Sequence, residues 1–387
     1  MTELTRSTIK PLAITMWDFS WLERRWPGSG FEDWGQALDE LLERGYNAVR
    51  IDAYPHLILR DPAAEYELIP VWSVNDWGSP MRCRVQVMPA LTDFISACAK
   101  RKIKVLLSSW FRRDTGQSWR MLFNPKLHAL AWSRTLNLIR DAGLMDTILG
   151  LDICNEWPIP IWAPYVYGED EDLAAGTGPK SYTWDDPRAL NWANETMDRI
   201  RQEYPAMPLT FSTQMDGDWG KAVNCDFWEP HIWMVGGEFY NRLQWTFTHK
   251  FDHSEFERVQ LYARDLYQAD PAHWQNILRG SIENMAAHAR SHGKVLMTTE
   301  CWGIVDYKDG PMLDWDWVME LCALGTEISA QSGSWAAIGT SNFCAPQFVG
   351  MWRDVAWHQR LTKLIKSSPI QVPLSADLAT RMAGAAG

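Results

Sequence analysis

Short apolar runs alternate with longer helical patterns eight times along the 387-residue chain. The runs occupy residues 12–17, 47–52, 103–109, 148–153, 208–212, 226–234, 294–300 and 334–339. Most are apolar almost throughout, which is typical of strands that are covered on both faces. The segments between them have helical spacing, as at Leu91, Phe94, Ile95 and Cys98, and Gly45 is a helix stop. Only the helix after the fifth run lacks a clear pattern.

Eight strand–helix units in a chain of this length predict an α/β fold, a (β/α)8 TIM barrel. An open doubly wound sheet is the alternative, but no Gly-x-Gly-x-x-Gly or Walker loop follows any strand. No linker or internal repeat is visible, so we expect residues 1–387 to form one catalytic domain. The long connections 53–88, 157–187 and 235–270 would lie over the carboxyl-end face of the barrel, where the active site is expected.

Charge and targeting signals narrow the class of protein. The chain has 37 Lys and Arg residues against 48 Asp and Glu residues, so its net charge is −11. This acidity argues against nucleic acid or an anionic membrane as a partner. No apolar stretch is long enough to span a bilayer, and the first residues do not resemble a secretory signal. Seven cysteines without a Cys-x-x-Cys pair fit a reducing compartment, so we expect a cytoplasmic protein.

Tryptophan is the compositional outlier, with 24 residues in the chain. Many of these rings must pack in the core, because indole is a large apolar group. So many also suggest surfaces that stack on flat, weakly polar ligand faces. Sugars and nucleobases both have such faces, and the acidic charge disfavours nucleobases.

Two glutamates follow strands that lie across a barrel from each other. Asn155 and Glu156 end the fourth run, and Glu300 ends the seventh. Retaining glycoside hydrolysis needs two carboxyl groups about 5–5.5 Å apart, and inverting hydrolysis needs about 6.5–9.5 Å. A single glutamate near a strand end is usually a surface acid, but a pair at these two ends favours catalysis.

With these residues the chain resembles the (β/α)8 clan of retaining glycoside hydrolases, and most closely glycoside hydrolase family 5, the cellulase-like family. Arg50 in the second run, His231 in the sixth and Trp335 in the eighth extend the resemblance over the whole chain. The resemblance implies that Glu156 is the general acid/base and Glu300 the nucleophile. It also implies that Asn155 bonds the sugar 2-hydroxyl and that Trp335 forms the floor under the sugar.

The chain departs from the family at two places. Trp233 stands where the family often has a tyrosine that donates to the nucleophile, and Ser109-Trp110 replace the histidine that usually ends the third strand. The donor to the nucleophile therefore stays open. Further candidates for substrate binding, each also explained by packing or a surface role, are Trp17, Trp110, Trp302, Trp233, Asp18, Asp52 and His56.

No metal or cofactor is expected. The nine histidines include no His-Glu-x-x-His motif, no Cys/His cluster has zinc spacing, and no Gly-x-Ser-x-Gly elbow suggests an esterase. We expect cofactor-free hydrolysis of a short oligosaccharide by an exo-β-glycosidase, because long loops tend to close a barrel mouth. Within family 5, residues 51–56 look most like those of β-mannosidases. Alternatives are an endo-β-1,4-glucanase or mannanase, and a non-catalytic carbohydrate-binding barrel.

Overall fold

Each of the eight apolar runs contains a β-strand in the computed structural model, which describes residues 9–70, 77–158, 184, 186–214, 223–234, 237–244, 253–305 and 307–387. The eight strands are β1 (Leu12–Asp18), β2 (Ala48–Asp52), β5 (Lys104–Ser108), β6 (Ile148–Asp152), β7 (Leu209–Thr210), β9 (Pro230–Trp233), β10 (Leu296–Thr298) and β12 (Trp335–Gly339). Two short strands continue the fifth and seventh runs, β8 (Thr213–Gln214) and β11 (Cys301–Trp302). An antiparallel pair, β3 (Glu65–Leu68) and β4 (Cys83–Gln86), lies within the connection 53–88.

The strands follow the order expected of a barrel. Seven form a parallel sheet in the order β10-β12-β1-β2-β5-β6-β7, and β11-β9-β8 form a second parallel sheet. The chain just before β9 bonds to both edges of the first sheet: the Asp226 amide donates to the Leu209 carbonyl at 2.9 Å, and the Met297 amide donates to the Trp228 carbonyl at 2.8 Å. This mostly parallel, curled arrangement is consistent with the predicted (β/α)8 barrel.

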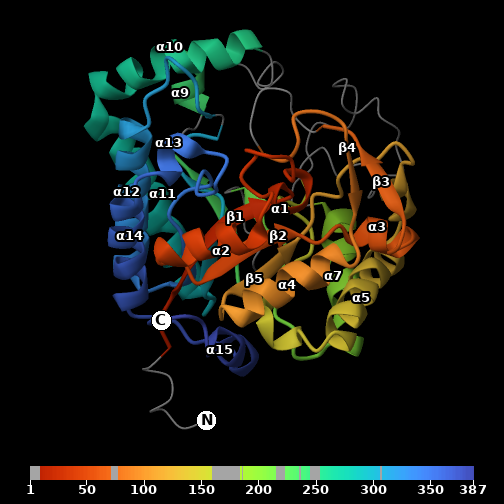
Figure 1. The fold of residues 1–387 in the computed structure, drawn as a ribbon. Coiled ribbons are helices and arrows are strands. Elements are labelled where there is room, and N and C mark those ends of the chain that lie inside the picture. Colours follow the sequence, from red (N-terminus) through yellow and green to blue (C-terminus); the bar gives the residue numbers. More distant parts are fainter. Residues whose placement is uncertain are drawn as a thin grey trace.

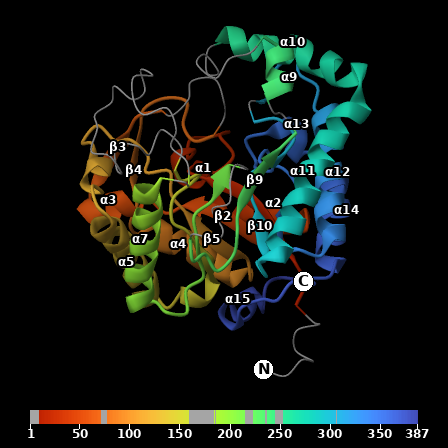
Figure 2. The ribbon, with the colours of Figure 1, turned by 180° about the vertical axis from the view of Figure 1, so that it is seen from behind.

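Helices surround the strands (Figures 1 and 2). Those that follow the predicted pattern are α2 (Trp34–Glu43), α4 (Ala90–Lys100), α5 (Pro125–Asp141), α7 (Pro187–Glu203), α11 (Pro271–Ser291), α12 (Asp316–Ser332) and α14 (Val355–Ser367). Additional helices are α1 (Ser20–Glu23), α3 (Pro55–Arg60), α9 (Gly237–Arg242), α10 (His253–Ala269), α13 (Val349–Trp352) and α15 (Ala376–Met382), with 3-10 turns η2 (Ser118–Met121) and η3 (Met145–Thr147). Residues 215–222, after the fifth run, lie outside the described part of the chain.

Local sequence explains where these helices begin. The Asp33 carboxylate accepts from the Gly35 and Gln36 amides at the start of α2, and Asn124 caps α5 in the same way through the Leu127 amide. Pro125 occupies the first turn of α5, where no amide hydrogen is needed. Each cap satisfies backbone donors that the helix itself cannot pair.

An apolar cluster closes the amino-end half of the ring of strands. It collects one or more side chains from most strands and from α15: Leu12, Ile14, Ala48, Leu106, Leu149, Phe227, Val295, Met297, Ala336, Leu378 and Met382. Helix α15 lies at the same end of the molecule as the C-terminus, opposite α9 and α10 (Figure 1). Along β2, Ala48 belongs to this cluster, and Arg50 and Asp52 follow toward the carboxyl end. The strands therefore pass from an apolar floor to a polar layer.

Two predictions stay untested: that the chain forms a single domain, and that the long connections lie over the carboxyl-end face. Parts of the three long connections, including residues 71–76, 159–183 and 245–252, lie outside the described residues.

Candidate active site

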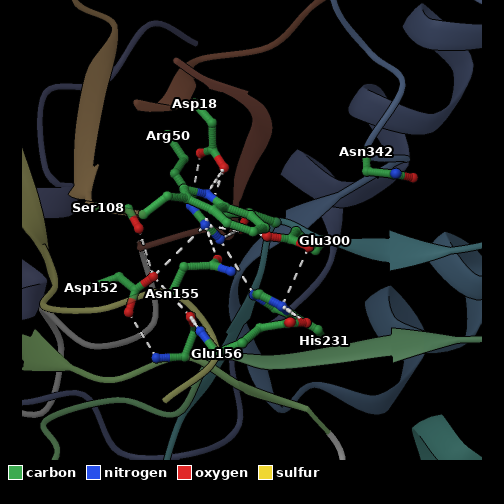
Figure 3. Close-up of polar contacts among 12 residues, drawn as sticks. Asp18, Arg50, Ser108, Asp152, Asn155, Glu156, His231, Glu300 and Asn342 are labelled. Atoms are coloured by element: carbon green, nitrogen blue, oxygen red, sulfur yellow. Dashed lines mark hydrogen bonds and ion pairs between the residues drawn. The ribbon is translucent and has the colours of Figure 1, made fainter. Parts of the chain in front are cut away.

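The polar layer gathers side chains from the carboxyl ends of five strands around one arginine (Figure 3). Arg50 comes from β2 and is fully buried. The side chains that surround it come from β1, β6 and β9, from the residues just after β6 and just before β9, and from the segment between β10 and β11: Asp18, Asp152, Asn155, Glu229, His231, Thr299 and Glu300. The eight-strand pattern thus brings together residues up to 282 positions apart, from 18 to 300.

Arg50 contacts four carboxylates. Its Nε lies 3.0 Å from Asp18 Oδ1, its Nη1 lies 3.3 Å from Glu229 Oε1, and its Nη2 lies 3.3 Å from Glu300 Oε1. Asp152 is more distant, at 3.8 Å. Burial opposes the charge of Arg50, but these carboxylates outweigh it and raise the pKa of the guanidinium. Arg50 is therefore a permanent cation that orients the nucleophile candidate.

The two predicted catalytic glutamates converge on one histidine nitrogen. His231 Nδ1 lies 2.9 Å from Glu156 Oε1 and 3.5 Å from Glu300 Oε2. One carboxylate oxygen of each glutamate and one ring nitrogen of His231 all lie within 4.8 Å of one another. Carboxyl oxygens this close fit the spacing of a retaining pair, about 5–5.5 Å, better than the wider inverting one.

The proton on His231 Nδ1 is fixed by its neighbours. Arg50 Nη1 has only hydrogens to offer and lies 3.3 Å from Nε2, so a neutral ring carries its proton on Nδ1. Burial lowers the pKa of His231, but Glu300 and Glu156 outweigh burial and raise it to about 9. In the neutral and the charged ring alike, Nδ1 donates to Glu156.

Glu300 holds its proton unusually well. Burial raises the pKa of its carboxyl to about 8, with His231 and Arg50 opposing this rise and Glu156 adding to it. Only 4% of the Glu300 surface is exposed, and only 8% of Glu156. Glu300 and His231 are therefore coupled to each other and to the charge of Glu156 in a largely buried site.

Glu156 has a second partner that the sequence pattern did not indicate. Gln214 Nε2 in β8 donates to Glu156 Oε2 at 2.9 Å, so both carboxylate oxygens are held. A glutamine amide can also accept a hydrogen bond, so it suits both protonation states of an acid/base. The Glu156 backbone has a φ of 52°, in the left-handed region, and its amide donates to Ser212 Oγ at 2.9 Å. Such a strained backbone is common at functional sites.

Trp335 does not form the predicted floor. It is the first residue of β12 and pairs with Leu296, the first residue of β10. Trp335 therefore lies at the amino end of these strands. Glu300 lies at the opposite end of these parallel strands. The prediction is wrong because it used the presence of tryptophan in the eighth run without its position along the strand.

Trp17 and Trp302 also pack away from the catalytic pair. Trp17 is fully buried against Phe31 and Phe94, with ring centroids 5.0 and 6.2 Å away. Trp302 packs on α12 so closely that a Cβ on Gly325 would meet its ring at 2.5 Å. Both rings are core packing, so their prediction as sugar walls is corrected.

Asp52 and His56 hold the chain in place. Asp52 is fully buried and accepts from the Tyr54 amide at 2.7 Å and the Trp110 amide at 2.8 Å. His56 Nε2 lies 2.8 Å from the Arg112 carbonyl, and burial lowers the pKa of this histidine to about 4. Both side chains are fully buried and hold neighbouring backbone groups, so these roles are structural.

Trp110 and Trp233 remain candidates for substrate contact. Both are only partly buried. The Trp110 indole donates to Asp18 Oδ2 at 2.5 Å, so Asp18 links this ring to Arg50. Asn155 accepts from Arg50 Nη2, which fixes its amide beside the glutamates.

Sequence reasoning missed Glu229, Asp152 and Asn342. Glu229 precedes His231 by two residues, so strand alternation would have pointed it to the same side. Asn342 follows β12, and its amide donates to the Cys301 carbonyl at 3.0 Å, one residue beyond Glu300. Its side chain is fully buried, and neither the nitrogen nor the oxygen of the side-chain amide has a hydrogen-bond partner among the residues that the structure describes. Figure 3 shows it apart from the dashed network.

Glu156, His231 and Glu300 could also hold a metal ion, because each offers one ligand atom within the 4.8 Å group. The Arg50 cation, 3.3 Å from both His231 and Glu300, opposes a second cation there. Hydrolysis without a metal stays a prediction.

The chain is similar to a known protein family and to solved structures. A family model described as sugar-binding cellulase-like matches residues 14–366. A protein from Parabacteroides distasonis ATCC 8503, provisionally named as a glycoside hydrolase, is 46% identical over 97% of this chain and 99% of its own, with a TM-score of 0.88. No curated protein matches the sequence.

Two more distant structures share the fold. The endo-β-1,4-mannanase from Thermotoga petrophila is 10% identical, with a TM-score of 0.53 over 95% of this chain and 79% of its own. The cellulose synthase subunit Z from Clostridioides difficile is also 10% identical, with a TM-score of 0.51 over 92% of this chain and 99% of its own.

The fold and the paired carboxylates define a glycoside hydrolase. The chain belongs to the sugar-binding cellulase-like family, as its resemblance to the cellulase-like hydrolases predicted. Among the helices in the described residues, none has the length and apolar character needed to cross a membrane.

Proposed function

We propose that this protein is a retaining exo-β-glycosidase that removes one terminal sugar by double displacement. The observation that carries the proposal is the convergence of Glu156 and Glu300 on His231 Nδ1, with carboxyl oxygens within 4.8 Å. A gap of this size leaves room for an anomeric carbon but not for a separate water molecule.

The first displacement forms a glycosyl ester. The active form carries the proton on Glu156 and leaves Glu300 ionised. The Glu300 carboxylate attacks the anomeric carbon as the bond to the leaving oxygen breaks, and Glu156 gives its proton to that oxygen. Arg50 keeps one Glu300 oxygen oriented at 3.3 Å. Asn155, fixed by Arg50, is placed to bond the 2-hydroxyl, a contact that strengthens in the transition state.

The second displacement releases the sugar. Glu156, now a carboxylate, takes a proton from water, and the resulting hydroxide attacks the anomeric carbon and frees Glu300. His231 and Gln214 each hold one Glu156 oxygen, at 2.9 Å in both cases. They stabilise the carboxylate that this step needs.

The burial of the catalytic pair supports action at a chain end. With 4% of Glu300 and 8% of Glu156 exposed, a polymer could not lie across the pair without a large opening of the protein. Mannose as the terminal sugar rests on the resemblance of residues 51–56 to those of β-mannosidases. The cytoplasmic location and the single-domain organisation are parts of the same proposal.

An endo-β-1,4-glucanase or mannanase is the alternative, because the fold is shared with an endo-acting enzyme and a fold does not set the mode of attack. A panel of p-nitrophenyl β-glycosides together with viscometry of glucomannan separates the two. Exo action releases p-nitrophenol from one sugar without a fast loss of viscosity. Fast viscosity loss selects the endo enzyme, and strong β-glucoside hydrolysis without β-mannoside hydrolysis excludes the mannose assignment.

Three variants test the catalytic roles. Glu300→Gln should abolish turnover of every substrate. Glu156→Ala should still form the ester from a dinitrophenyl glycoside, whose leaving group needs no acid, and added azide should restore turnover as a β-glycosyl azide. Glu195→Gln is the matched control, since Glu195 is half-exposed on α7 and pairs with the neighbouring Arg199. Unchanged turnover in Glu300→Gln contradicts the nucleophile assignment, as does an α-anomer as the first product of the wild type.

A further inference from the structure

A hollow of about 440 Å³ lies outside the catalytic cluster and shares no residue with it. Its walls include two indoles, two guanidinium groups and two other polar side chains: Trp26, Trp34, Arg25, Arg84, Gln86 and Glu23. We call it the rim hollow. Trp34 is the first residue of α2, and Ala90, the first residue of α4, also lines it. Helices of a βα barrel begin at the carboxyl-end face, so the rim hollow lies on the outer edge of the same face as the active site.

Trp26 is the exposed aromatic of the rim hollow. It is 40% exposed and is the one tryptophan so exposed among the residues that the structure describes. The Arg24 guanidinium lies over its ring, 5.0 Å from the centroid. Arg24 is itself buried, donating to the Ser29 carbonyl at 3.0 Å and the Gly78 carbonyl at 3.1 Å. A fixed cation therefore supports the indole and leaves its remaining surface to the hollow.

The turn that carries Trp26 is held rigidly. The Glu32 carboxylate accepts from the Gly28 amide and the Gly30 amide, both at 2.8 Å, and the Ser29 amide donates to the Trp26 carbonyl at 3.1 Å. Gly28 and Gly30 have φ values of 79° and 101°, which only glycine adopts without strain. A rigid turn that exposes a large indole gains little from burial, so the arrangement fits ligand binding better than packing.

Arg25 and Trp34 form the opposite wall. The Arg25 guanidinium stacks over the Trp34 ring, 3.8 Å from its centroid, and Nη2 donates to the Glu32 carbonyl at 3.2 Å. The stack holds the plane of the guanidinium, whose other N–H groups can donate to hydroxyls. Aromatic faces with planar donors beside them match the apolar faces and equatorial hydroxyls of a sugar ring.

The charges around the rim hollow balance. Glu23 pairs with Arg112 at 2.7 Å, and Arg84 lies 3.8 Å from Glu65 and 3.9 Å from Glu67. Arg25 is near two acids, Asp33 and Glu32. Each guanidinium that lines the hollow therefore has a carboxylate nearby, and the net charge of −11 also disfavours an anionic ligand. A neutral ligand fits better.

We infer that the rim hollow is a second carbohydrate site, which stacks one residue of a neutral oligosaccharide on Trp26 and donates to its hydroxyls from Arg25. The inference rests on the proposed function for the substrate class, since the site would tether longer substrates beside the active site. Tethering raises the local concentration of chain ends at the catalytic pair.

Calorimetric titration of the full-length Glu300→Gln protein with mannopentaose and cellopentaose tests this inference. We expect a binding event in addition to the active site, and Trp26→Ala in the same background should weaken it at least about tenfold. In the otherwise wild-type enzyme, Trp26→Ala should raise KM for the pentasaccharide and leave kcat/KM for the p-nitrophenyl monosaccharide unchanged.

Tyr262→Ala is the matched control, because Tyr262 is an equally accessible aromatic, 55% exposed on α10. An isotherm that Trp26→Ala leaves unchanged overturns the inference, as does an equal loss in Tyr262→Ala. A melting temperature within 1–2 °C of the parent, about the effect of a surface substitution, verifies that Trp26→Ala is folded. If the wild type hydrolyses no glycoside, the proposed function fails, and the pentasaccharide isotherms still decide whether the rim hollow binds sugar.

Discussion

The buried pair of Glu300 and His231 should make this protein less stable as the pH rises through neutrality. The pKa of Glu300 is raised from 4.5 to about 8, and the pKa of His231 from 6.5 to about 9. Both groups therefore bind protons more tightly in the folded state than in the unfolded one. A raised pKa contributes stability below the unfolded value, and this contribution is lost as the pH rises through the folded value.

The size of the effect follows from the number of protons. Between pH 6.5 and 8.0 the folded protein retains at least one proton that the unfolded chain has lost, and each such proton costs about 1.4 kcal/mol per pH unit. The loss over this window is about 2 kcal/mol. With an unfolding entropy of about 2.1 cal/mol/K per residue, that corresponds to a fall in melting temperature of about 2–3 °C for this chain.

Glu300→Gln isolates this contribution. The substitution removes one titrating group and also the chief cause of the raised His231 pKa. Other buried acids with raised pKa values, such as Asp52 at about 7, are common to both proteins and cancel in the difference. Tryptophan fluorescence during thermal and urea unfolding at pH 6.5 and 8.0 measures the effect, with Glu195→Gln as the exposed control.

The wild type and Glu195→Gln should lose about 2 kcal/mol more than Glu300→Gln between these two pH values. Equal losses in all three proteins would show that Glu300 and His231 do not retain protons in the folded state, and their coupling would then be refuted.

Three further features are tested by substitution. Asn342→Leu removes two buried side-chain atoms that have no partner among the described residues, so the melting temperature should rise by about 1–4 °C. Asn47→Leu breaks bonds to two backbone groups and should lower it, and a fall in both proteins would mean that Asn342 has partners. Glu229→Gln removes a negative charge beside Arg50, which should favour the ionised form of Glu300. The acid limb of the pH profile of kcat/KM should then move about one pH unit lower, and an unmoved limb contradicts this. Gly325→Ala puts a methyl group 2.5 Å from the Trp302 ring and should lower the free energy of unfolding by about 1–3 kcal/mol, measured by urea unfolding. A gain in stability would show that the ring is not packed there.

Much of the fold could be predicted from hydrophobic patterning, because strands covered on both faces must be apolar and helices on the outside must be amphipathic. Residues 148–153 and α5 illustrate the two patterns. The breaks between β7 and β8 and between β10 and β11 were not predictable in this way. They depend on backbone pairing with β9, which leaves no mark on hydrophobic periodicity.

The proximity of Glu156 and Glu300 was predictable because both are polar residues at the ends of apolar runs. Trp335 was misplaced because an apolar residue gives no sign of which end of its strand it occupies. Trp17 and Trp302 are at strand ends, but their rings face the helices, and only neighbouring side chains decide that. Gln214 was missed because a lone glutamine after a weak run carries no chemical signature.

Arg50 draws its partners from strands spread across nearly the whole chain, and this has a consequence for how activity arises. A fragment ending before residue 229 lacks four of the groups that hold the guanidinium, and one beginning after residue 50 lacks the cation itself. Activity therefore requires that all the strands that supply partners of Arg50 have come together. Recovery of hydrolysis after dilution from denaturant would report the last step of folding, after secondary structure has already returned.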